Sequence, residues 1–153
     1  MNTVSKRLTL FFATGAYSGY VPVMPGTVGT LVGILVFLPL AGLALPLYAA
    51  VSCAVIVFSI VVSGRAEQVL GKKDPGAVVI DEIAGYLVTM ATFPADWRYL
   101  AIGFVLFRVM DIWKPFPANL ANDRVHGGLG IVLDDLIAGV YANLCLQVIR
   151  MVW

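Results

Sequence analysis

One uncharged stretch limits most strongly what this chain can fold into. From Leu8 to Gly64, 57 consecutive residues include no Asp, Glu, Lys, Arg or His. About 20 apolar helical residues cross a bilayer, so this stretch is long enough to cross more than once. Charged residues make up 12% of the chain and hydrophobic residues 60%, whereas a typical soluble domain is about 25% charged. The sequence therefore predicts a single integral-membrane domain over residues 1–153.

Apolar segments separated by turn signals continue to the end of the chain. They predict an all-α fold, a polytopic membrane helical bundle of about five spans preceded by an N-terminal interfacial or re-entrant segment. The predicted spans are residues 27–44, 47–63, 78–93, 99–113 and 131–152. Residues 8–26 are apolar but are broken by three glycines and two prolines. There we expect a short interfacial helix and a re-entrant loop, with Thr27 capping the next helix.

The basic residues predict the orientation of this bundle. With five spans, the N-terminus and two of the loops lie on one side of the membrane. That side carries Lys6, Arg7, Arg65, Lys72, Lys73, Lys114 and Arg124, and the other side carries Arg98 and Arg150. Basic residues are enriched on the cytoplasmic side. We therefore expect a multi-pass protein of the cytoplasmic membrane with its N-terminus inside the cell.

Five carboxylates fall at the cytoplasmic boundary of the predicted spans. They are Asp81, Glu82, Asp111, Asp134 and Asp135. Arg108 and Lys114 lie one helical turn before and after Asp111. Gly85 and Gly139 each follow an acid by four residues, a spacing typical of closely packed helices, and such packing would bring the acids together.

Carboxylates gathered in an apolar protein repel one another unless a cation holds them. Oxygen ligands of this kind suit Mg²⁺, which can also bind phosphate oxygens and activate a water molecule. Neighbouring Arg and Lys side chains can neutralise a transferring phosphoryl group. This pattern indicates phosphoryl chemistry at the cytoplasmic face, on a substrate whose other end is lipid. Plainer interpretations are acids that stabilise helix N-termini and a structural ion pair between Arg108 and Asp111.

Four blocks of the sequence carry a resemblance to a known family. They include the motif Arg-x-x-Asp-x-x-Lys-Pro from Arg108 and the motif Gly-Gly-x-Gly-Ile-x-x-Asp-Asp from Gly127. The other two blocks lie at 12–29 and 79–85. Together, over residues 11–142, they resemble phosphatidylglycerophosphatase A. The resemblance implies a Mg²⁺-dependent phosphatase of the bacterial inner membrane that converts phosphatidylglycerophosphate to phosphatidylglycerol in phospholipid biosynthesis.

Roles for individual residues follow as hypotheses. The five acids supply the Mg²⁺ ligands, and one of them acts as general base or, alternatively, forms a phospho-aspartate. The residues expected to bind the substrate phosphate are Arg108, Lys114, Arg124, Ser18, Gly26 and Thr27. The expected partners are the phospholipid substrate and membrane lipids, and the net charge of +1 gives no general attraction to nucleic acid. The sequence does not indicate the oligomeric state.

Three other classes of protein could hold membrane acids. A CDP-alcohol phosphotransferase requires an Asp-Gly-x-x-Ala-Arg signature, which this chain lacks. An ion- or proton-coupled transporter places acids nearer the bilayer centre, with a path to the far side. A non-enzymatic membrane protein has no need of Arg108 and Lys114 beside buried acids. The transporter remains the principal alternative.

Overall fold

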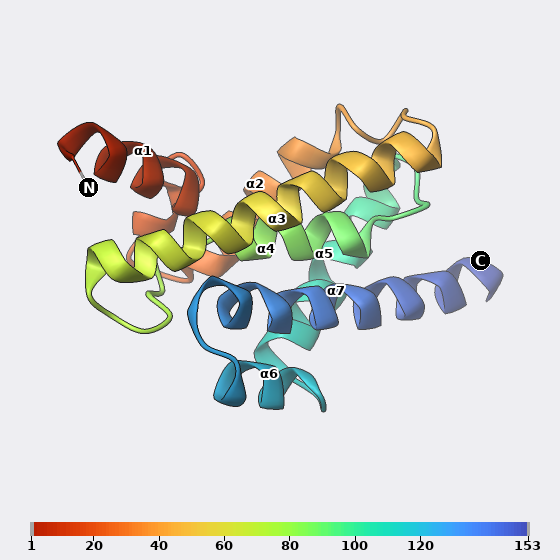
Figure 1. The fold of residues 1–153 in the computed structure, drawn as a ribbon. Coiled ribbons are helices and arrows are strands. Elements are labelled where there is room, and N and C mark those ends of the chain that lie inside the picture. Colours follow the sequence, from red (N-terminus) through yellow and green to blue (C-terminus); the bar gives the residue numbers. More distant parts are fainter. Residues whose placement is uncertain (1, 153) are drawn as a thin grey trace.

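The computed structural model describes residues 2–152, except for the side chains at 121–123, and in this part of the chain helices joined by loops are the only regular secondary structure (Figure 1). The all-α prediction is therefore confirmed. The helices are α1 (Thr3–Ala13), the 3₁₀ turn η1 (Ser18–Tyr20), α2 (Pro25–Phe37), α3 (Leu45–Leu70), α4 (Ile80–Thr89), α5 (Trp97–Trp113), α6 (Ala118–Arg124) and α7 (Gly127–Val152).

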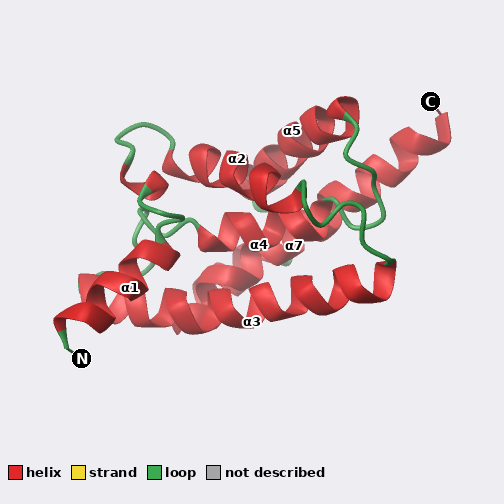
Figure 2. Cartoon of the chain, turned by 90° about the horizontal axis from the view of Figure 1, so that it is seen from above, coloured by secondary structure: helices red, strands yellow, loops and turns green. Residues whose placement is uncertain are grey.

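The short helix α4 forms the centre of the fold. It contacts α2, α3, α5 and α7, and in Figure 2 it lies between α3 on one side and α2 and α5 on the other. Eight of its ten residues are buried. A helix of ten residues is about 15 Å long, half of the hydrocarbon thickness of about 30 Å. Helix α4 is therefore a core helix enclosed by longer ones.

Two helices, α3 and α7, are long and apolar enough to cross a membrane. They correspond to the predicted spans 47–63 and 131–152, and each extends beyond the predicted bounds. Helix α5 agrees closely with the predicted span 99–113. The five-span bundle as a whole stays a prediction, because the segments 27–44 and 78–93 form shorter helices than expected.

Local breaks explain these short helices. Helix α2 ends at Phe37 because Pro39 follows and lacks a backbone N–H donor. The segment after α4 turns at Thr92, whose φ is +73°, and then reaches Pro94. An apolar composition alone does not reveal such breaks, since the flanking residues are as hydrophobic as the helices.

The N-terminal region begins with a helix followed by an irregular loop, which is the order predicted for residues 8–26, whereas the interfacial or re-entrant placement of this segment stays a prediction. The loop contains three successive residues with positive φ, Gly15, Ala16 and Tyr17. The expected cap at Thr27 is wrong: α2 begins two residues earlier, and Met24, with a φ of +52°, is its N-cap. Helix α6 lies in a segment that was expected to be a loop.

Two glycines let α4 and α7 approach closely. A Cβ atom at Gly139 would lie 2.4 Å from the carbonyl oxygen of Gly85. A Cβ at Gly85 would lie 2.7 Å from the carbonyl oxygen of Asp135 and 2.6 Å from the Phe107 ring. No side chain fits at such distances, so the predicted close packing at these two positions is confirmed.

Gly139→Ala should therefore destabilise the protein, because the added methyl group forces the two backbones apart. We expect the free energy of unfolding to fall by about 1–3 kcal/mol, as for other overpacked cores. Thermal unfolding in detergent micelles, followed by circular dichroism, measures the change. Gly42→Ala is the control, since no atom of the described residues would lie within 4 Å of the added Cβ. An equal melting temperature for both variants would contradict the close contact.

Candidate active site

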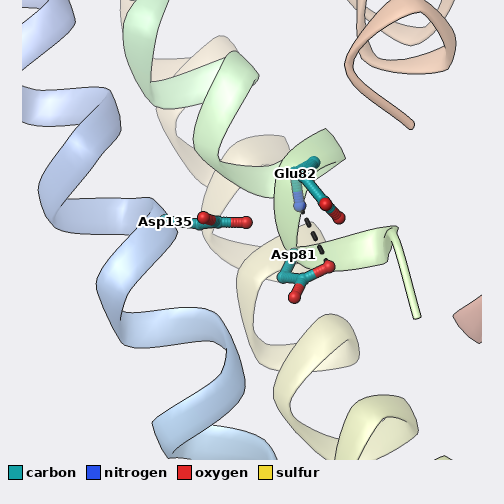
Figure 3. Close-up of side chains that lie close together, drawn as sticks. All are labelled: Asp81, Glu82 and Asp135. Carbon is teal, nitrogen blue, oxygen red and sulfur yellow. Dashed lines mark hydrogen bonds between the residues drawn. The ribbon is translucent and has the colours of Figure 1, made fainter. Parts of the chain in front are cut away.

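Three carboxylates converge where α4 begins. Asp81 and Glu82 are in the first turn of α4, and Asp135 points toward them from α7 (Figure 3). One oxygen from each of the three lies within 4.8 Å of the others. The backbone N–H of Glu82 donates a hydrogen bond of 3.1 Å to Asp81 Oδ1. The positive end of the α4 dipole further stabilises negative charge at this position.

Neighbouring helices hold the start of α4 in place. The backbone N–H of Val79 donates to the carbonyl oxygen of Ala13 at 2.9 Å, which ties α4 to the end of α1. The hydroxyl of Ser59 on α3 donates to the carbonyl oxygen of Ile80 at 3.2 Å. The acids of α4 are thus anchored to α1 and α3, while the glycine contact fixes them relative to α7.

The three carboxylates line a cavity of about 370 Å³ that also contains cationic side chains. Arg108 Nη1 lies 2.7 Å from Asp111 Oδ2 and 4.0 Å from Glu82 Oε1. Lys114 donates a hydrogen bond to Asp134 on α7. The cavity therefore gathers six acids and two bases, which come from α4, α5 with its C-cap, α7 and the loop after α3. The charged residues along its wall are Asp74, Asp81, Glu82, Arg108, Asp111, Lys114, Asp134 and Asp135.

Several buried polar atoms at this cavity have no hydrogen-bond partner among the described residues. They include Glu82 Oε2, Asp134 Oδ1 and Arg108 Nε. Buried polar atoms are normally paired, because leaving one unpaired costs about 1–3 kcal/mol. Free carboxylate oxygens suit a hard cation such as Mg²⁺, and a free guanidinium N–H suits an anion. The side chains thus fit a divalent cation with an anion beside it.

The charge of Lys114 is maintained by its surroundings. Burial alone lowers the pKa of this ammonium group, but the hydrogen bond to Asp134 and the negative charges of Asp134, Asp111 and Asp135 together outweigh it and raise the pKa of Lys114. Lys114 also has a φ of +47° where it caps the C-terminus of α5. Its side chain therefore remains a cation at the edge of the cavity.

Not every residue predicted for the site lines the cavity. The five acids, Arg108, Lys114 and Gly26 do. The hydroxyl of Ser18 instead donates to the carbonyl oxygen of Thr14 at 3.2 Å, and Arg124 is exposed at the end of α6. Thr27 is partly buried beside Gly26, and its hydroxyl has no hydrogen-bond partner in the described part of the chain.

The sequence reasoning missed one acid, Asp74. It follows α3, lies in the cavity wall and is exposed to solvent. Its Asp-Pro-Gly context predicted a turn, and the turn is present, with a φ of +45° at Asp74. No other feature of the sequence marks this residue, because a turn has no regular spacing that would relate Asp74 to the acids on the helices. Cys53 and Cys145 are free thiols, and neither belongs to the described cavity wall.

A cluster of carboxylates beside an arginine and a lysine, enclosed by apolar helices, is the arrangement expected of a membrane-associated phosphatase. The comparison with known families identifies which one. The family model for Phosphatidylglycerophosphatase A matches residues 11–150, and the chain belongs to that family. It is accordingly a phosphoric monoester hydrolase.

Curated relatives agree with this assignment. The chain is 38% identical to phosphatidylglycerophosphatase A of Escherichia coli over 84% of its length and 75% of the relative's. It is 32% identical to the Haemophilus influenzae protein of the same name, over 92% and 91% of the two chains. A Bacteroides thetaiotaomicron relative, 33% identical over 95% of both chains, has the provisional name phosphatidylinositol-3-phosphatase. No solved structure matches the chain.

Gly26→Ala should disturb the site without unfolding the protein. The new Cβ would lie 2.3 Å from Glu82 Oε1 and 3.0 Å from Arg108 Nη1, so both side-chain ends must move. Small displacements of positioning groups can cost up to about 100-fold in rate, and we expect a loss of about tenfold or more in phosphatase activity. Gly76→Ala, in the same cavity wall but with nothing within 4 Å, should retain activity. Equal activities would show that the Glu82–Arg108 geometry is unimportant.

Proposed function

We propose that this protein hydrolyses phosphatidylglycerophosphate to phosphatidylglycerol and phosphate, the final step of phosphatidylglycerol synthesis. The observation that carries the proposal is the convergence of Asp81, Glu82 and Asp135 in a cavity that also holds Arg108 and Lys114. The names of the E. coli and H. influenzae relatives support the same substrate. Family membership also favours a phosphatase over the transporter that the sequence left open.

The carboxylates would hold Mg²⁺ within this cavity. Asp81, Glu82 and Asp135 form the closest set of oxygens, and Asp111 and Asp134 lie in the same wall, already paired with Arg108 and Lys114. Bound Mg²⁺ supplies Lewis-acid polarisation of the phosphoryl group and lowers the pKa of a bound water. The ion pairs keep the excess negative charge of the outer two acids from repelling the substrate phosphate.

The remaining groups bind the phosphate and move protons. Arg108 and Lys114 bind the phosphomonoester oxygens, and the N-terminus of α2 at Gly26 presents its positive dipole end to the same anion. A carboxylate accepts a proton from the attacking water, whose oxygen forms a bond to phosphorus. The bond from phosphorus to the glycerol oxygen breaks, and that oxygen takes the proton from the same carboxylate to become the hydroxyl of the product.

We further propose that the chain crosses the cytoplasmic membrane several times with the cavity at the cytoplasmic face. Helices α2 and α4 begin at the cavity and α5 ends there, which is the alternation expected of successive antiparallel passes. The apolar helices α3 and α7 support insertion. The excess of basic residues at the cavity end supports the orientation.

Phosphate release from phosphatidylglycerophosphate in detergent micelles tests the reaction. We expect release that requires Mg²⁺, stops with EDTA, and falls more than about 100-fold in Asp81→Asn and Asp135→Asn, beyond the loss usual for outer-shell partners of a metal. Asp96→Asn is the matched control, because this acid caps α5 by accepting a hydrogen bond from the backbone N–H of Arg98 and Asn can do the same.

Two results would contradict the proposal. Folded wild-type protein that releases no phosphate at any Mg²⁺ concentration would remove the assigned reaction. Full activity in EDTA, or in both site variants, would remove the carboxylate metal site while leaving the phosphatase family unchanged.

Cysteine labelling tests the topology. In a Cys53→Ser, Cys145→Ser background, Ala95→Cys in the turn before α5 should react with a membrane-impermeant maleimide added to intact spheroplasts. Lys73→Cys, in the exposed loop after α3, should react only after lysis. Labelling of both positions from outside would contradict the proposed crossing of the membrane.

A further inference from the structure

The cavity has an apolar edge on two of its walls. Met24 lies on one wall at the start of α2, and Ile112 lies on another near the end of α5. Both side chains line the same cavity as the carboxylates, yet Met24 is 58% and Ile112 67% exposed. Helices α2 and α5 contact each other. These two residues therefore border the cavity where it opens to the surroundings.

On each wall the chain changes from charged to apolar surroundings within two residues. Gly26 lies so close to Glu82 that a Cβ would come within 2.3 Å of the carboxylate, and two residues earlier Met24 is exposed. Asp111 is paired with Arg108 at 2.7 Å, and the next residue, Ile112, is exposed. A cavity that is charged inside and apolar at its opening is complementary to an amphipathic ligand, with its phosphate inside and its hydrocarbon outside.

Aromatic residues next to this opening indicate its depth. Trp113, which lies between Ile112 and Lys114 in the sequence, is 71% exposed, and so is Phe116. Tryptophan is enriched where the headgroups of a bilayer meet its hydrocarbon. A phospholipid at that level has its glycerol backbone beside the opening, its headgroup on the polar side and its acyl chains in the hydrocarbon.

We propose that the opening between Met24 and Ile112 is a lateral entry site for a phospholipid phosphomonoester. The phosphate passes between these side chains to Arg108 and Lys114, while the first methylene groups of the acyl chains stay in contact with Met24 and Ile112. A lipid is the occupant because this apolar surface is continuous with a charged cavity that binds its headgroup. The inference rests on the proposed function and adds that these two residues select substrates that have long acyl chains.

Two chain lengths of one substrate test this role. We compare kcat/KM for dioleoyl and dihexanoyl phosphatidylglycerophosphate in the wild type and in the double variant Met24→Ser, Ile112→Ser. The ratio of the long-chain to the short-chain value should fall at least fivefold, mainly through KM for the long-chain lipid. Val105→Ser is the control, because Val105 is 57% exposed on the same helix two turns from Ile112 and should keep the wild-type ratio. An unchanged ratio in the double variant would overturn the entry site.

A binding measurement separates this inference from the proposed reaction. Phosphatidic acid with a diazirine near the carboxyl end of one acyl chain is photolysed with the full-length protein in phosphatidylcholine nanodiscs. Labelling at residues 20–26 and 109–116 should decrease when excess dihexanoyl phosphatidic acid is added, whereas labelling near residue 105 should not. Labelling that the competitor leaves unchanged would overturn the entry site. Competed labelling without hydrolysis of phosphatidylglycerophosphate would instead count against the reaction alone.

Discussion

The contact between α4 and α7 at Gly85 and Gly139 determines the rest of this structure. A Cβ at Gly139 would lie 2.4 Å from the Gly85 carbonyl oxygen, so the two backbones touch. Asp81 and Asp135 each lie four residues, about one turn, before these glycines. The contact therefore brings the two carboxylates face to face, and without it the site would divide into two separate acids on separate helices.

Ion pairs in the cavity reduce the repulsion between these closely spaced carboxylates. Three carboxylates would repel one another in an apolar interior, and desolvation adds several kcal/mol for each ion. Pairing of Asp111 with Arg108 and of Asp134 with Lys114 neutralises the outer acids. The start of α4 contributes a partial positive charge to Asp81 and Glu82. The negative charge at the centre of the cluster remains uncompensated, and a divalent cation bound there would reduce the repulsion most.

The site was more predictable than the helix bounds. The five acids, Arg108 and Lys114 were expected to meet because alternating passes place the ends of successive helices together, and all seven line one cavity. Gly85 and Gly139 signalled the contact through their spacing. Composition could not reveal that α4 has only ten residues, because its apolar flanks look like more helix. Asp74 was missed for a different reason. Its Asp-Pro-Gly sequence is explained fully by a turn, so nothing in it indicated that the carboxylate also lines the cavity.

The position of the acids along α7 explains why the site lies inside the protein. Asp134 and Asp135 are the eighth and ninth residues of α7, so they lie about 12 Å from its first residue. The prediction placed this helix start at residue 131, which would have put both acids close to the helix end. Helix α4 begins level with them because Gly85 packs against Gly139, and the space next to its first turn is the cavity. A phosphate that reaches this depth leaves bulk water, and the weaker dielectric screening there strengthens its attraction to Arg108 and Lys114. The depth also requires an apolar route for the rest of a lipid, which the exposed Met24 and Ile112 offer at the opening.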